Sequence, residues 1–131
     1  MRAFLAHSFD ERHGQEELLT CIEDVLNTFG VEAFSFVKSY PPYGAGEEQK
    51  MMDDAFRELS KCDILIAEAS TKAIGVGIEV GYAKSRSIPV IYLYSAESPA
   101  SKTIMGCADF TIKYTDTESL TAQLSKILKT I

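Results

Sequence analysis

Residues 63–83 read DILIAEASTKAIGVGIEVGYA. The continuous apolar run Ile64–Ala67 has the length of a buried strand, and the glycine-spaced segment after it predicts a helix over residues 76–86. This spacing places Glu79 in the first turn of the helix, at the carboxyl end of a parallel strand, where open α/β sheets bind ligands. Unpaired N–H groups at a helix start favour an ionised carboxylate. We therefore expect Glu79 to be a nucleophile rather than an acid.

On either side of this segment, predicted strands alternate with predicted helices. Strands are expected at residues 3–7, 32–37, 63–67, 89–94 and 110–114, and helices at 14–29, 47–61, 76–86 and 118–131. The alternation predicts one α/β domain over residues 1–131, a three-layer sandwich with a five-stranded parallel sheet of the flavodoxin-like or Rossmann-like kind. The Pro-Pro segment at 38–46 is expected to lack regular structure. No glycine follows the first strand before Gly14, which argues against an ordinary NAD or FAD Rossmann domain.

Composition narrows the possible function classes. The 131 residues carry a net charge of −6, which argues against a nucleic-acid polymer as partner. No apolar run reaches membrane-spanning length, so no membrane partner is expected. Three widely spaced cysteines and two histidines favour free thiols in a reducing cytoplasm over a metal site or a disulfide framework. Neither a metal nor a cofactor is expected.

Two motifs, Cys62–Ser70 (CDILIAEAS) and Gly75–Ala83 (GVGIEVGYA), resemble the signature of the nucleoside 2-deoxyribosyltransferase superfamily. The resemblance extends through residues 89–94 to residues 101–109 and is weak before Asp53. In length the chain resembles the short 2′-deoxynucleoside 5′-phosphate N-hydrolases of that family. The resemblance implies cleavage of the N-glycosidic bond of nucleosides or (deoxy)nucleoside 5′-monophosphates, by hydrolysis or by 2-deoxyribosyl transfer.

The resemblance also implies roles for two residues. Glu79 would attack the anomeric carbon, because an ionised carboxylate stabilises an oxocarbenium-like transition state or traps it covalently. Ser101 would reach a 5′-phosphate in the partner subunit's site, which requires a homodimer or a higher homo-oligomer with a shared active site. The bare helix face at Gly77 and Gly81 and the loop at residues 98–105 are the surfaces expected in that interface.

The chain also departs from the family pattern. Phe4 stands where the family commonly has a tyrosine on the first strand, so that hydroxyl is missing. The family acid on the helix before the third strand aligns with Ala55. We expect Asp54, or failing it Asp53, to supply the proton, although one residue corresponds to about 100° around a helix. A glycine-rich, arginine-containing turn after the first strand is replaced by HSFD, and its Asp10 opposes a phosphate-bearing substrate.

Several further residues are candidates for substrate binding, and each has a structural alternative. His7 either donates to a ligand or fills a hydrogen-bonded packing position. Ser8 either binds sugar or phosphate or caps the first helix, and Glu68 either binds a sugar hydroxyl or pins the loop after it. Tyr40 and Tyr43 either stack on a base or cover an edge of the core. The full set expected to bind substrate is Phe4, His7, Ser8, Glu68, Ser70, Gly75, Gly77 and Ser101.

The sequence leaves two other functions open besides bond cleavage. One is a nucleotide-binding sensor that has lost turnover, since the replaced residues are what such a loss would produce. The other is a Toll/interleukin-receptor-like NAD-cleaving or signalling domain, which also begins with a short strand and uses a glutamate on a helix. The chain has no tryptophan, and the glutamate motif of that domain usually contains one. The sensor is therefore the stronger competitor.

Overall fold

The computed structural model describes residues 1–8 and 15–131, and its parallel strands have the order β2-β1-β3-β4-β5. The strands are β1 (Arg2–Ala6), β2 (Glu32–Ser35), β3 (Ile64–Glu68), β4 (Val90–Ser95) and β5 (Phe110–Tyr114). The helices are α1 (Gln15–Thr28), α2 (Phe36–Ser39), α3 (Glu48–Ser60), α4 (Ile74–Ser85), α5 (Lys102–Cys107) and α6 (Thr117–Leu128). This strand order is flavodoxin-like. The expected α/β fold with a five-stranded parallel sheet is confirmed.

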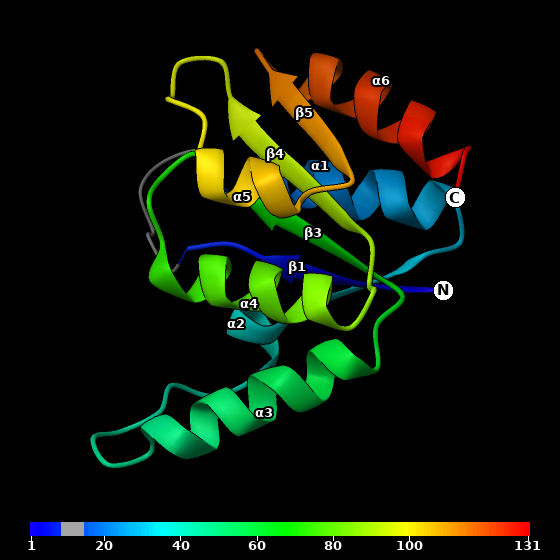
Figure 1. The fold of residues 1–131 in the computed structure, drawn as a ribbon. Helices are drawn as coiled ribbons and strands as arrows, with labels where there is room; N and C mark the ends of the chain where they lie inside the picture. The colour runs from blue at the N-terminus through cyan, green and yellow to red at the C-terminus, as the bar shows by residue number, and fades with distance from the viewer. Residues whose placement is uncertain (9–14) are drawn as a thin grey trace.

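Two helical layers enclose the sheet (Figure 1). On one face, Leu26 of α1 and Leu124 of α6 belong to a buried cluster with Ile66 of β3. On the other face, Val80 of α4 belongs to a second buried cluster with Leu65 of β3. Side chains of α3 and α5 complete this cluster. Successive side chains of a strand point to opposite faces, so β3 supplies both clusters. This explains why its apolar run is continuous rather than alternating.

Two short helices differ from the sequence-based expectation. Residues 36–37, predicted as the end of a strand, begin α2, and the Ser35 side chain caps that helix by accepting a backbone N–H. The expected loop at residues 98–105 contains the start of α5, where Ser101 Oγ accepts the N–H of Ile104 at 3.2 Å. Helices of four and six residues span too few turns to produce a detectable periodicity.

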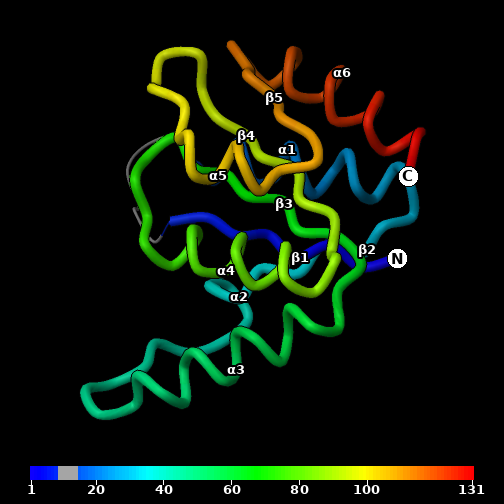
Figure 2. The backbone as a smooth tube through the Cα atoms, viewed as in Figure 1, coloured from blue at the N-terminus to red at the C-terminus, as the bar shows by residue number. Residues whose placement is uncertain are grey.

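The direction in which successive strands are added to the sheet reverses at β1, which has β2 on one side and β3 on the other. This position is the topological switch point of the sheet. Ligands of such sheets bind in the crevice outside the carboxyl ends of the strands at this point. Figure 2 shows that β1 ends at the same edge from which the connection between β3 and α4 leaves the sheet. Because α4 begins at Ile74, two residues earlier than predicted, Glu79 lies in its second turn rather than its first.

Candidate active site

A cavity of about 280 Å³ opens at this edge of the sheet, between the end of β1 and the start of α4. Segments that are far apart in the sequence line it, including the beginning of α2 and one side of α3. The lining residues are Leu5, Ala6, His7, Ser8, Phe36, Val37, Met51, Met52, Ala55, Ala73, Ile74, Gly75, Val76 and Glu79. A mostly apolar wall with a few converging polar groups is typical of a small-molecule site. We refer to it as the Glu79 cavity.

Glu79 is half-buried in this cavity, and burial raises the pKa of its carboxyl group to about 7. The expectation that the start of the helix favours its ionised form is wrong. Only the first four N–H groups of a helix lack a partner within it, and Glu79 lies beyond them because α4 begins at Ile74. Burial in apolar surroundings instead disfavours the charge. A carboxyl group with a pKa near neutrality exchanges a proton readily and is poised for chemistry.

His7 is buried at the end of β1, with both ring nitrogens in contact with protein atoms. Its Nδ1 lies 3.2 Å from the carbonyl oxygen of Ser8, which can only accept, so Nδ1 carries the proton. In the neutral ring Nε2 then accepts the hydroxyl proton of Ser35, at 2.9 Å. Burial lowers the pKa of His7 below its usual range, which keeps the ring neutral near pH 7. These contacts favour the packing interpretation of His7 over a role as proton donor.

Ser8 and the two glycines differ in their relation to the cavity. Ser8 is half-buried and lines the cavity, and its Oγ accepts from Gln15 Nε2 at 3.4 Å. Gly75 also lines the cavity, whereas Gly77 does not. A Cβ built at either glycine would meet no atom of the described residues within 4 Å, apart from the helix backbone and the adjacent residues. The backbone at Gly75 is therefore open to close approach by a ligand.

Asp54 is buried on α3 but does not line the Glu79 cavity, whereas Ala55 does. The helix has not shifted to bring the aspartate to the position of the family acid. Asp54 instead accepts the Tyr43 hydroxyl at 2.6 Å and pairs with Arg57 and Lys50, and these contacts hold its pKa at about 2. A carboxyl group that stays ionised has no proton to give. The predicted role of Asp54 as proton donor does not fit this geometry, and neighbouring Asp53 is exposed and lies outside the cavity too.

Sequences of known proteins resemble the chain, although no known family profile matches it. A protein provisionally named 2′-deoxynucleoside 5′-phosphate N-hydrolase 1 from Syntrophotalea carbinolica is 46% identical over 50 residues, which is 37% of this chain and 35% of that protein. Its namesake from Methanosarcina mazei is 30% identical over 106 residues, which is 76% of this chain and 66% of that protein. The chain thus matches between about one third and two thirds of the length of these relatives.

A solved 2-deoxyribosyltransferase from Bacillus psychrosaccharolyticus has the same fold, with a TM-score of 0.75 over 98% of this chain and 96% of that one. Together, the named sequence relatives and this shared fold confirm the resemblance to the nucleoside 2-deoxyribosyltransferase superfamily. At 16% identity the solved structure shows the shared fold alone. Within this deoxyribosyltransferase-like fold, the end of β1 and the start of α4 line the Glu79 cavity, beside the topological switch point of the sheet.

Glu68 and Ser70 form a hydrogen-bonded network outside the Glu79 cavity of this deoxyribosyltransferase-like chain. Glu68 accepts the backbone N–H and the hydroxyl of Ser70, each at 2.9 Å, and the hydroxyl of Tyr114. Ser70 Oγ in turn accepts the N–H of Ser95 at 2.8 Å. The network joins the carboxyl ends of β3, β4 and β5. These contacts favour the loop-pinning interpretation of Glu68 over the sugar-binding one.

Two other predicted site residues, Phe4 and Ser101, do not line the cavity. Phe4 is fully buried in the core and packs on Phe34, with ring centroids 5.7 Å apart, so its ring cannot touch a ligand. Ser101 caps α5 and donates its backbone N–H to Tyr92 Oη at 2.8 Å, away from the cavity lining of its own chain. Asp10, from which the argument against phosphate was drawn, lies outside the described residues.

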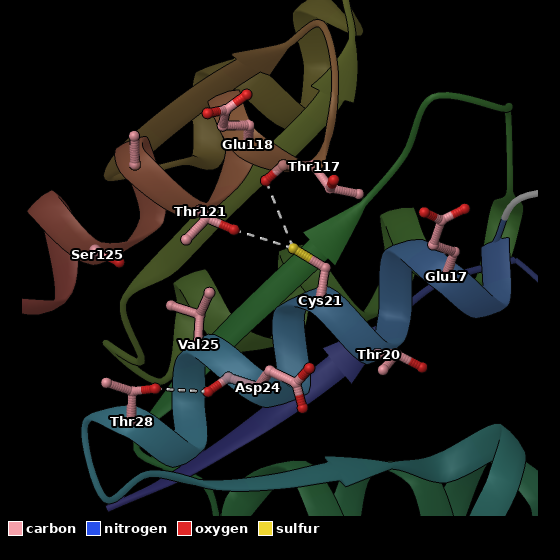
Figure 3. Close-up of a pocket in the computed structure, with 11 residues that line it drawn as sticks. Glu17, Thr20, Cys21, Asp24, Val25, Thr28, Thr117, Glu118, Thr121 and Ser125 are labelled. Atoms are coloured by element: carbon pink, nitrogen blue, oxygen red, sulfur yellow. Dashed lines mark hydrogen bonds between the residues drawn. The ribbon is translucent and has the colours of Figure 1, made fainter.

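A larger hollow, of about 820 Å³, lies between α1 and α6 on the opposite face of the sheet (Figure 3). Its lining includes four threonines and three acidic residues, and Cys21 Sγ lies 3.2 Å from Thr121 Oγ1. None of its lining residues lines the Glu79 cavity, and volume alone does not mark the active site. Within residues 1–8 and 15–131, no group of three or more His, Cys, Asp or Glu side chains is arranged to hold a metal ion. No helix of those ranges is long and apolar enough to cross a bilayer.

Proposed function

We propose that this chain cleaves the N-glycosidic bond of nucleosides or (deoxy)nucleoside 5′-monophosphates, by hydrolysis or 2-deoxyribosyl transfer, with Glu79 as the nucleophile. One observation carries the proposal. Among the described lining residues, Glu79 alone brings a carboxyl group to an apolar cavity at the switch point of the sheet. The names of the curated relatives and of the solved transferase support the same target bond.

In the proposed reaction a carboxylate oxygen of Glu79 bonds to the anomeric carbon. The bond from that carbon to the base nitrogen breaks, and its electron pair leaves with the base, which takes a proton from water. A water molecule, or a second base in the transfer reaction, then displaces Glu79 and restores the carboxylate. The apolar walls strengthen the attraction between the carboxylate and the developing positive charge because they exclude water.

In the proposed reaction, no described side chain of the cavity is placed to protonate the departing base. The described lining residues include no second carboxyl group, and His7 is neutral with both nitrogens in use. We therefore propose that the chain acts best on bases that leave readily without prior protonation. A nucleotide-binding sensor without turnover, the competing function, would also lack such a proton donor.

We also propose that the chain forms a homodimer through α4. Ile74 and Ile78 of this helix are 86% and 46% exposed, and Gly77 and Gly81 beside them leave the surface bare. An exposed apolar helix face is suited to burial against a second copy. Ile74 also lines the Glu79 cavity, so the same contact would cover the open side of the cavity. Binding of a 5′-phosphate by the partner subunit's Ser101 is part of this proposal.

A cytoplasmic location completes the proposal. Cys21, Cys62 and Cys107 are all free thiols in the structure. Free thiols, one of them buried, agree with a reducing compartment.

Incubation with a panel of nucleosides, 5′-monophosphates and NAD, followed by chromatography of free base, tests the proposed function. We expect the wild-type chain to release base from a nucleoside or a monophosphate, and Glu79→Gln to lose that release while its circular dichroism is unchanged. Binding without release from any substrate supports the sensor. Release from NAD alone supports the Toll/interleukin-receptor-like domain.

A further inference from the structure

A second pocket, of about 400 Å³, adjoins the Glu79 cavity. Phe36, Val37 and Met51 line both spaces, and the Tyr40–Tyr43 segment (YPPY) forms the far side of the second one. We refer to this space as the aromatic pocket. We infer that the aromatic pocket binds the planar base of the substrate while the sugar lies at Glu79. The identity of the substrate rests on the proposed function, and the pocket itself rests on the following contacts.

Three aromatic rings meet in the pocket. The centroid of Phe36 lies 4.7 Å from that of Tyr40 and 6.2 Å from that of Tyr43, and the planes of Phe36 and Tyr43 are only 12° apart. Pro41 and Pro42 add flat apolar surface between the two tyrosines. Nucleobases bind to such surfaces by stacking, because every base has a π-face.

Buried carboxylates on α3 hold the two tyrosines in place. Tyr43 donates its hydroxyl to Asp54 at 2.6 Å, and Tyr40 donates its hydroxyl to Glu58 at 2.7 Å. Each carboxylate is itself fixed by two cations, Lys50 and Arg57 for Asp54, and Arg2 and Lys61 for Glu58. The rings are thus ordered before a ligand arrives, which lowers the entropy lost on binding. Asp54 is accordingly a positioning residue.

The chemistry of the pocket selects an uncharged planar ligand. Its described lining consists of aromatic, proline, valine and methionine side chains, without a charged group. The nearby Lys50 ammonium lies 5.4 Å from the centroid of the Tyr43 ring and already pairs with Asp54. A phosphate would need charged or N–H donors that this wall does not offer. Flexible Met51 lets one pocket accept bases of different outline.

Equilibrium binding of free adenine and free cytosine to the full chain tests the inference without requiring turnover. The chain has no tryptophan, so quenching of tyrosine fluorescence reports a base stacked on a tyrosine, with calorimetry as a second readout. Tyr82→Leu is the matched control, because Tyr82 stacks on Phe56 outside both cavities. Tyr40→Leu replaces Tyr43→Leu if the latter loses its circular dichroism.

We expect Tyr43→Leu to weaken the binding of both bases about tenfold or more. Tyr43→Phe keeps the ring and Asp54→Asn keeps the shape, so each should weaken binding by only about threefold. Tyr82→Leu should bind as the wild type does. Absence of base binding by the wild type up to the solubility limit, or equal binding by Tyr43→Leu, overturns the inference.

Nucleoside cleavage by the same variants separates this inference from the proposed function. We expect Tyr43→Leu to raise KM more than it lowers kcat, and Tyr43→Phe to restore KM. Base binding that depends on Tyr43 in a chain that cleaves no substrate would support the aromatic pocket and contradict the proposed function. Cleavage that depends on Glu79 but has the same KM in Tyr43→Leu would do the reverse.

Discussion

Glu68 and Glu79 both lie near the carboxyl edge of the sheet, one at the end of β3 and the other on the helix that follows. Glu68 is 5% exposed and accepts three hydrogen bonds, two from Ser70 and one from Tyr114. Glu79 faces a mostly apolar cavity, and its burial there raises the pKa of its carboxyl group. A buried carboxylate surrounded by donors fixes the scaffold, whereas one against an apolar wall keeps its reactivity.

The sharpest test of this difference is catalytic. Glu79→Gln should lower kcat/KM by at least about a thousandfold, because the amide cannot form the glycosyl ester. Glu68→Gln should lower kcat/KM by less than about tenfold, because Glu68 affects the reaction only through the geometry of the loop that it holds. Initial rates of base release measure both, with circular dichroism as the check on folding. Equal losses in the two variants would mean that Glu68 also takes part in the reaction.

For stability, we expect the larger effect from Glu68→Gln and the smaller one from Glu79→Gln. Glu68→Gln replaces a charged acceptor of three hydrogen bonds and should lower the free energy of unfolding by about 2–3 kcal/mol. Glu79→Gln at pH 7 should not destabilise the chain, because it removes a group whose charge is disfavoured in the folded state. Urea denaturation monitored by circular dichroism gives both values. A loss of stability in Glu79→Gln as large as that in Glu68→Gln would contradict the comparison.

The raised pKa of Glu79 also predicts a pH dependence. Its contribution to stability is full below the ordinary glutamate pKa of about 4.3 and is lost as pH rises through about 7, because the folded chain holds the proton more tightly. Between pH 4 and pH 8, the free energy of unfolding of Glu79→Gln should therefore rise relative to that of the wild type by on the order of 2 kcal/mol. The kcat/KM of the wild type should rise to a plateau above about pH 7, as the carboxylate forms. Parallel stability curves for the two proteins would rule out the burial effect.

Asp54 offers a third carboxylate with a smaller expected effect. Asp54→Asn should slow the cleavage of good and poor leaving groups by the same few-fold factor, because Asp54 supports Tyr43 and does not reach the Glu79 cavity. A proton donor would instead matter most for poor leaving groups. Rates on nucleosides with graded leaving groups distinguish the two roles. Selective loss on poor leaving groups would restore the acid role expected from the sequence.

The sequence predicts the sheet well, because a central parallel strand such as β3 has a continuous apolar run and the helices α1, α3 and α4 between the strands are long. It does not predict α2, which is only four residues long, although this helix brings Phe36 and Val37 into both cavities. Met51 of α3 both packs against a core cluster and lines the two cavities.

The candidate site is only partly predictable for a geometric reason. The motif around Glu79 identifies the residue that faces the cavity, but its environment depends on where α4 begins, and a shift of two residues moves the carboxylate beyond the free N–H groups. The neighbours Asp54 and Ala55 show the same limit. Sequence adjacency suggests that one replaces the other, while the direction of each side chain on the helix puts only Ala55 in the cavity.

The glycines of α4 have a consequence for helix propensity. Each glycine within a helix costs roughly 1 kcal/mol relative to alanine, and α4 contains Gly75, Gly77 and Gly81. Beyond the backbone of α4 and the adjacent residues, no atom of residues 1–8 and 15–131 lies within 4 Å of a Cβ built at any of them, so packing within this part of the chain does not require these glycines. Gly77→Ala should therefore make an isolated chain more stable. If Gly77→Ala loses assembly or turnover, the space left open by the absent Cβ of Gly77 is needed by a second copy of the chain or by the substrate.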